Sequence, residues 1–233
     1  MRDAPAWLYD ETKQIGTDYE DVSEIRIYDQ RMAKIRDVKK ELREVLKSLD
    51  LTPESTVLEM GTGTGEFPIA AVKRCSKVIA ADISLPMLEY AREKAKERLR
   101  EEGRAGDFER IEFVRGGLLT YQPSAKPLDA VVSQFALHHL PDFWKQVALI
   151  RIAGMLKSGG RLYIRDVVYS FDAADYEGFF DRYISRMAEI GGEGTPHDIL
   201  VHIRDEHSTI GWILEGMIEG AGFIATFLCV KRG

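Results

Sequence analysis

The chain begins with a helical pattern of apolar and polar residues and continues with alternating strand and helix patterns. Over residues 21–49, apolar residues recur every three or four positions with Lys, Arg and Glu between them, and this spacing predicts one amphipathic helix. Pro53 ends the pattern and leads into residues 56–58, which are rich in strand-forming side chains. Residues 1–50 are therefore expected to form a helical cap ahead of a sheet.

From residue 56 to about residue 170, short strand patterns alternate with longer helical ones. Helices are predicted over residues 67–73, 84–102 and 143–156, and Ser84 is suited to cap the second of them. Strands are predicted over residues 56–58, 77–81, 111–115, 128–133 and 161–168. Strands joined by single helices form right-handed crossovers and a parallel sheet. The expected fold class is α/β, a doubly wound, Rossmann-like, mostly parallel sheet with helices on both faces.

The last third of the chain has a different pattern. Aromatic residues at helical spacing over residues 172–190 predict an inserted helix, which three glycines then interrupt. Ser208 or Thr209 is suited to cap a last helix, and residues 223–230 are predicted to form a terminal strand. There is room for one such strand. The sheet edge is then either one strand short or completed by another element or by a partner subunit in a homodimer.

Composition narrows the classes of protein that fit. The 233 residues, 45% hydrophobic and 30% charged, are enough for a single hydrophobic core. A net charge of −6 argues against nucleic-acid binding, because phosphate contacts need clustered Lys and Arg. The chain has no apolar run long enough to span a membrane, and its first residues lack the basic end and apolar run of a signal peptide. We therefore expect a cytoplasmic protein with no membrane contact.

A predicted strand is followed by three glycines at alternate positions, Gly61, Gly63 and Gly65. Glycines permit positive φ and let a ligand approach the backbone closely. The dinucleotide fingerprint requires a glycine five residues after its first one, but Glu66 and Pro68 stand at the two positions where it could fall. This spacing disfavours an NAD-dependent oxidoreductase.

Residues 57–65, with Glu59 two positions before the first glycine, resemble the first motif of class I S-adenosylmethionine-dependent methyltransferases. Three later segments resemble further motifs of this family, in the same order: residues 78–88, 128–141 and 155–161. The resemblance implies S-adenosyl-L-methionine as cofactor and methyl transfer to O, N or C of a small molecule by in-line displacement. It also implies one domain with cap helices (1–50), a cofactor-binding core (51–170), a helical insert (171–207) and a last helix and strand (208–233).

The same resemblance implies roles for individual residues. Asp82 takes the two ribose hydroxyls, since a carboxylate matches a vicinal diol, and Glu59 orients the glycine loop and the amino group of the cofactor. Many family members carry an acid at the position of Gly117. The backbone of Gly117 and Leu118 is therefore expected to contact the adenine edge. The remaining cofactor contacts are expected from Gly61, Thr62, Gly63, Gly65, Ile83, Met87 and Gln134.

Candidates for the acceptor side follow the fourth and fifth strands, because ligands lie beyond the carboxyl ends of parallel strands. His138 and His139 are candidate catalytic residues, since a loop histidine can act as a general base near neutral pH. Packing or helix capping is the alternative role for both histidines. The candidate substrate pocket adds Tyr28, Arg165, Asp166, His202 and His207.

No metal is expected in this protein. His202 and His207, with Asp198 or Asp205, offer imidazole and carboxylate groups, but a spacing of five residues does not place two ligands on one helical face. Two alternatives to the methyltransferase remain open. One is a cofactor-binding or assembly protein without turnover, which Gly117 and the short tail favour, and the other is the NAD-dependent oxidoreductase.

Overall fold

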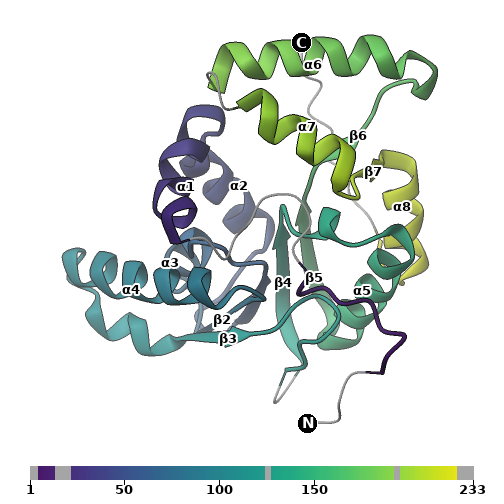
Figure 1. Cartoon of the computed structure of the whole chain (residues 1–233). Coiled ribbons are helices and arrows are strands. Elements are labelled where there is room, and N and C mark those ends of the chain that lie inside the picture. The colour runs from purple at the N-terminus through teal and green to yellow at the C-terminus, as the bar shows by residue number, and fades with distance from the viewer. Residues whose placement is uncertain (1–4, 14–21, 124–126, 192–194, 225–233) are drawn as a thin grey trace.

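The computed structural model describes residues 5–13, 22–123, 127–191 and 195–224 (Figure 1). At its centre is one parallel sheet with the strand order β3-β2-β1-β4-β5. The strands are β1 (Thr56–Met60), β2 (Lys77–Asp82), β3 (Ile111–Arg115), β4 (Leu128–Gln134) and β5 (Leu156–Arg165). The order reverses between β1 and β4, which is the doubly wound arrangement predicted from the sequence.

Two layers of helices cover the sheet, and neighbouring residues of β1 point to opposite layers, as the pleat of a strand requires. Val57 packs in a cluster with α2 (Val38–Ser48), α3 (Glu66–Ala71) and α4 (Leu85–Glu101). Leu58 packs on the other face with α5 (Asp142–Met155) and α8 (Gly211–Gly220). The interior strands are therefore buried on both faces.

The N-terminal cap differs from the prediction of a single helix over residues 21–49, which was wrong. The chain forms α1 (Val22–Ile35) and then α2. The break has a local cause, because the Asp37 side chain accepts a hydrogen bond from the backbone N–H of Lys40 at 2.9 Å and so caps the second helix. The apolar stripe continues across this break, and that continuity hides it in the sequence.

Most boundaries in the core agree with the predicted ones. Ser84 caps α4 as expected, accepting a hydrogen bond from the backbone N–H of Met87 at 3.2 Å. The start of β5 differs. Leu156 already pairs with Leu128, and residues 157–160 bulge out before the ladder resumes at Arg161. The predicted turn before the fifth strand is therefore a bulge inside β5.

The last third forms α6 (Tyr176–Gly191), α7 (Thr195–Asp205) and a small parallel pair, β6 (Val168–Tyr169) with β7 (Thr209–Ile210). Figure 1 shows α1, α6 and α7 gathered beyond one end of the main sheet. Helix α6 agrees with the predicted inserted helix, whereas α7 was not predicted. The predicted cap of the last helix by Ser208 or Thr209 was wrong, because α8 has Ile210 at its N-cap and no side-chain bond there.

Three short 3-10 helices complete the described elements: η1 (Ala105–Arg110), η2 (Leu137–His139) and η3 (Ala173–Asp175). Phe223 and Ile224 follow α8 without strand structure, and the rest of the predicted terminal strand lies outside the described residues. Within the described ranges, none of the helices is both long and apolar enough to cross a bilayer.

Candidate active site

The point where the strand order reverses positions the site. The chain leaves β1 toward β2 and β3 on one side, whereas β4 and β5 lie on the other, so the segments that follow β1 and β4 diverge. Gln134, the last residue of β4, donates from Nε2 to Glu59 Oε1 across this point at 3.2 Å. The carboxyl ends of β1 and β4 are thus linked where α/β proteins bind ligands.

The glycine turn follows β1 directly and is anchored to the neighbouring strand. The backbone N–H groups of Gly61 and Thr62 donate to the carbonyl of Ala81 at 2.9 and 3.0 Å. Gly61 has φ +77°, and a Cβ atom there would lie 2.5 Å from the Cβ of Ala136. Gly63 has φ +50°, and a Cβ there would meet nothing within 4 Å. Position 61 requires glycine for packing and conformation, whereas the backbone at Gly63 faces open space.

Asp82 ends β2 beside this turn, and its side chain is 8% exposed. The Oδ2 atom accepts the backbone N–H of Gly63 at 2.8 Å, and Oδ1 accepts the backbone N–H of Ser84 at 3.0 Å. An ionised carboxylate offers about four acceptor positions. Two backbone donors thus fix the orientation of the Asp82 carboxylate beside the glycine turn.

Glu59 is the most deeply buried acid of the site, with 3% of its surface exposed. Its Oε2 accepts from Thr62 Oγ1 at 2.6 Å. Burial raises the pKa of Glu59 to about 8, a shift that nearby Asp82 increases and that the hydrogen bonds from Thr62 and Gln134 reduce. Glu59 therefore favours its protonated form near neutral pH, and a cationic ligand beside it would favour loss of that proton to solvent.

Gly117 lies after β3, and the carboxylate of Glu11 occupies the space where its side chain would begin. A Cβ atom at Gly117 would lie 2.6 Å from Glu11 Oε1 and closer to the carboxyl carbon. Glu11 is buried, and it accepts from the backbone N–H groups of Leu119 at 2.9 Å and Thr120 at 2.8 Å. The N-terminal segment thus supplies an acid where the loop itself has none.

Helix α1 is held against the glycine turn by a small polar network. Thr64 Oγ1 donates to Asp29 Oδ1 at 2.6 Å, and Lys94 of α4 forms an ion pair with the same carboxylate. Burial raises the pKa of Tyr28, and the charge of Asp82 adds to that shift. Tyr28 is therefore a buried residue of α1 close enough to Asp82 to be affected by its charge.

A cluster of imidazoles and carboxylates lies beyond β4 and β5. In η2, His138 pairs through Nδ1 with Asp166 and lies 3.3 Å from Glu206 through Nε2. His202 of α7 pairs with the same Glu206, and the rings of His138 and His139 are 4.3 Å apart. These side chains come from three segments that are distant in sequence.

The two adjacent histidines have opposite pKa shifts. Burial alone would lower the pKa of His138, but Asp166 and Glu206 together raise it. Burial and the charge of His138 lower the pKa of His139 to about 4. His139 is therefore neutral at physiological pH, whereas His138 is held by carboxylates on both sides.

Two candidate pocket residues do not join this cluster through their side chains. Arg165 turns toward α2, where it forms ion pairs with Glu41 at 3.3 Å and Glu44 at 2.6 Å. His207 contacts the cluster through its backbone, since its N–H donates to the carbonyl of His138 at 2.8 Å. The acidic side chains of α2 therefore bind the Arg165 guanidinium and hold it away from the cluster.

Glu11 and Glu206 were both missed as site residues in the sequence analysis. Glu206 follows His202 by four residues, a spacing that places two side chains on one helical face and could have indicated the pair. No sequence signal relates Glu11 to a loop more than 100 residues away.

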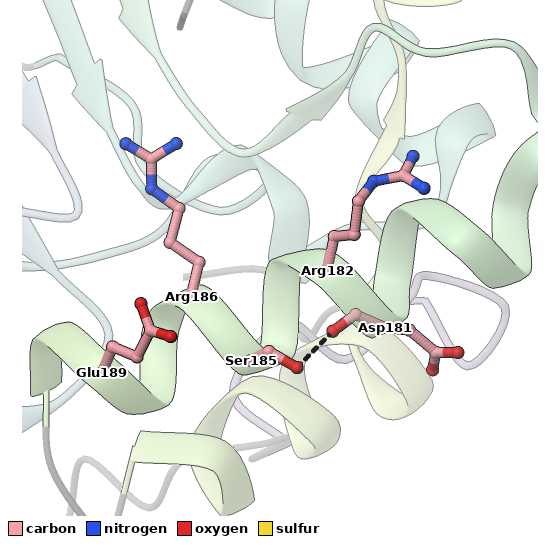
Figure 2. Close-up of a pocket in the computed structure, with 5 residues that line it drawn as sticks. All are labelled: Asp181, Arg182, Ser185, Arg186 and Glu189. Atoms are coloured by element: carbon pink, nitrogen blue, oxygen red, sulfur yellow. Dashed lines mark hydrogen bonds between the residues drawn. The ribbon is translucent and has the colours of Figure 1, made fainter.

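A surface hollow lies elsewhere, on α6 (Figure 2). Its lining residues all belong to this one helix: Asp181, Arg182, Ser185, Arg186 and Glu189. Ser185 Oγ donates to the backbone carbonyl of Asp181 at 2.8 Å, a bond within the helix. The hollow is therefore a feature of the outer helix surface and contains none of the groups at the sheet edge.

Known proteins resemble both the sequence and the fold. The family described as Methyltransferase domain matches residues 57–160. An uncharacterized methyltransferase of Geobacillus sp. (strain WCH70) is 29% identical over 192 residues, covering 82% of this chain and 80% of the relative. The YcgJ protein from Bacillus subtilis has a TM-score of 0.58 at 20% identity, covering 78% of this chain and 68% of that one. A putative methyltransferase from Bacillus halodurans C-125 also has a TM-score of 0.58, at 20% identity and with coverages of 79% and 69%.

The family match includes the glycine turn, Asp82 and the end of β4, which are the elements that form the site. The solved structures share the parallel sheet and its covering helices, so they confirm the predicted fold class. The oxidoreductase and the protein without turnover, left open by the sequence, are set aside. The comparisons thus support the class I S-adenosylmethionine-dependent methyltransferase family for this chain, through a domain match over residues 57–160.

Proposed function

We propose that the protein binds S-adenosyl-L-methionine across the carboxyl ends of β1, β2 and β4 and transfers its methyl group to O, N or C of a small molecule. The observation that carries this proposal is the pose of Asp82, which two backbone N–H groups orient beside the glycine turn at 2.8 and 3.0 Å. A carboxylate held in this way can accept both hydroxyls of a ribose. Ile83 and Met87, which follow Asp82 in the chain, flank the ribose and adenine in this pose.

The methionine end of the cofactor passes the glycine turn, where Gly63 faces open space. Glu59 receives the α-amino group of the cofactor, directly or through the Thr62 and Gln134 side chains that it already contacts. A positive group near Glu59 stabilises its ionised form, which burial alone disfavours. Binding the amino group would thus convert Glu59 to a carboxylate.

The loop after β3 binds the adenine end of the cofactor. The backbone of Gly117 and Leu118 contacts the adenine edge, and Glu11 provides the acidic group that accepts from the adenine amino group. This role for Glu11 is supported by the contact of its carboxylate with the Cβ position of Gly117 and by its two backbone donors. Glu11 would then make the N-terminal segment around it part of the cofactor site.

The acceptor lies between the sulfonium and the cap formed by α1, α6 and α7. Methyl transfer by in-line displacement depends on alignment of the acceptor and exclusion of water. Tyr28 faces this region from α1, and His138, His139 and Asp166 face it from the ends of β4 and β5. His138 and His139 are the candidate catalytic groups. A small acceptor fits the cap and the net charge of −6, which disfavours nucleic acid.

Turnover over a panel of small metabolites tests the proposal. The protein is incubated with S-adenosylmethionine and each metabolite, and formation of S-adenosylhomocysteine is measured. We expect product with at least one small acceptor and much less with an Asp82→Ala variant at the same limiting concentration of cofactor. Turnover seen only with RNA, DNA or protein substrates would contradict the assignment to small molecules. The cytoplasmic location and the homodimer remain predictions, which fractionation and light scattering test.

A further inference from the structure

His138, His139 and Glu206 bring three potential metal ligands into one buried place. Each side chain offers one ligand atom, and the three atoms lie within 4.8 Å of one another. The histidines belong to η2 after β4, and Glu206 directly follows α7. From this convergence we propose a site for one divalent transition-metal cation, of which zinc fits best.

One edge of the ligand triangle already has the length that zinc requires. Two ligand atoms bound tetrahedrally to zinc at about 2.0–2.1 Å lie about 3.3–3.4 Å apart. His138 Nε2 and the Glu206 carboxylate are 3.3 Å apart. The remaining separations between ligand atoms are at most 4.8 Å, and a bound metal would draw these atoms closer together.

The far side of His138 is fixed as it is in known metal sites. Its Nδ1 pairs with Asp166, whose carboxylate also accepts from the backbone N–H groups of Leu137 at 2.8 Å and Val167 at 2.7 Å. With Nδ1–H donated to Asp166, the Nε2 lone pair faces Glu206. A carboxylate that orients a ligating histidine in this way is the usual arrangement around a bound metal.

The Nε2 lone pair of His138 and the Glu206 carboxylate are both acceptors, so a positive charge is needed between them. The side chains of His138, Asp166 and Glu206 are 7%, 3% and 4% exposed, so water contributes little to neutralising the two carboxylates. A metal ion bound between His138 and Glu206 supplies this charge, and the neighbouring His139 offers a third ligand atom.

His202 positions Glu206 for this role. Its Nδ1 pairs with the Glu206 carboxylate, and its Nε2 lies 3.1 Å from Ser208 Oγ. Both ring nitrogens thus have partners, and the carboxylate is held toward His138. This set differs from the one weighed in the sequence analysis, where His202 and His207 were considered as ligands.

The donor set selects among divalent ions. Two imidazoles and one carboxylate suit zinc and other transition metals, whereas magnesium and calcium prefer oxygen ligands alone. Three protein ligands leave a fourth position for a water molecule or a ligand. At the carboxyl edge of β4 and β5, that position can hold a heteroatom of the methyl acceptor. This last use depends on the proposed function, but the metal site itself does not.

Metal binding is measured on the full chain after removal of any affinity tag and treatment with a chelator. Co²⁺ is titrated and its visible d–d absorption followed, and Zn²⁺ is then added as a competitor. We expect one equivalent of Co²⁺ with the spectrum of a four- or five-coordinate site, displaced by one equivalent of Zn²⁺. The variants His139→Ala and Glu206→Gln should each weaken binding by more than about ten-fold, and Asp166→Asn by about ten-fold or more.

His197→Ala is the matched control, because His197 is an exposed histidine of α7 outside the cluster, and its metal affinity should equal that of the parent. Circular dichroism identifies any variant that fails to fold, and Glu206→Gln keeps the size of the native side chain and one acceptor oxygen for His202. A parent protein without specific Co²⁺ or Zn²⁺ binding would overturn the proposal and leave His138 as an imidazolium between two carboxylates. Equal binding by the parent and a folded Glu206→Gln variant would also overturn it. Because the readout is metal binding, failure here leaves the proposed methyl transfer untouched.

Discussion

The carboxylate of Glu11 lies against the α-carbon of Gly117, in the space that a side chain at residue 117 would fill. Glu11 reaches this position from the N-terminal segment and is bonded there by the backbone N–H groups of Leu119 and Thr120. The absence of a side chain at Gly117 and the presence of a buried acid from elsewhere are therefore parts of one arrangement.

This arrangement predicts that Gly117→Ala destabilises the fold. The added methyl group displaces the Glu11 carboxylate from Leu119 and Thr120, which costs about 1–3 kcal/mol in the free energy of unfolding. Gly154→Ala is the control, because a Cβ at Gly154 in α5 meets nothing within 4 Å and alanine favours helix by up to about 1 kcal/mol. Chemical denaturation measures both variants. Equal stability of Gly117→Ala and the parent would argue against the contact.

A second prediction concerns rescue of cofactor affinity. Glu11→Ala removes the acid and should weaken binding of S-adenosylmethionine by about ten-fold, the loss of one hydrogen bond to a charged group. Adding Gly117→Asp to this variant places a carboxylate in the vacated space. The double variant should recover most of the affinity of the parent in calorimetric titrations. Gly117→Asp alone, in which Glu11 still occupies that space, should not reach the affinity of the parent. Unchanged affinity in Glu11→Ala would remove Glu11 from the adenine site.

Local patterns in the sequence were sufficient to predict the core. The alternation of strand and helix patterns, the Ser84 cap and the glycine spacing each depend on residues close together in the chain. These signals predict the structure well because strand and helix periodicity and helix caps each depend on residues that are close together in the chain. The grouping of Glu59, Asp82 and Gln134 at one site was implied by the resemblance to methyltransferase motifs, and a hydrogen bond joins Gln134 to Glu59 in the structure.

What the sequence did not predict depends on distant contacts or on competing local signals. Helix α7 follows a glycine-rich stretch that reads as loop, yet Asp198 of α7 pairs with Arg31 of α1 at 3.4 Å and helps to hold the helix in place. The break between α1 and α2 is hidden because their apolar stripes continue. The partners of Glu11 and Glu206 are set by tertiary structure, which one sequence without relatives does not display.

The raised pKa of Glu59 predicts how stability depends on pH. The folded protein keeps a proton on Glu59 from the ordinary pKa of 4.5 up to about 8, whereas the unfolded chain has lost it. The contribution of Glu59 to the free energy of unfolding is therefore fully present below pH 4.5 and is lost as pH rises through 8. Between pH 6 and pH 8.5, the Tm of the cofactor-free parent should fall by about 3 °C or more relative to that of Glu59→Gln. Parallel Tm profiles of the two proteins would contradict the shift.

The same proton should leave when the cofactor binds. At pH 6.5 the α-amino group of the cofactor is already protonated, because its ordinary pKa is about 7.7–8.0. Its charge favours the ionised form of Glu59, so binding should release about one proton per site. Calorimetry in phosphate and imidazole buffers, which differ in ionisation enthalpy, measures the release. Glu59→Gln should show no difference between the buffers, and a parent that also shows none would place the amino group elsewhere.

The central claim is that Asp82 anchors the ribose of S-adenosylmethionine at the end of β2. Calorimetric titration of the parent, Asp82→Ala and Asp181→Ala tests it most directly, since Asp181 is an exposed acid that lines the separate surface hollow on α6 (Figure 2). Loss of the hydrogen bonds to the charged group should raise the Kd of Asp82→Ala by about 30- to 150-fold, roughly 2–3 kcal/mol. Asp181→Ala should bind as the parent does. An Asp82→Ala protein that is folded and binds the cofactor as tightly as the parent would contradict the account.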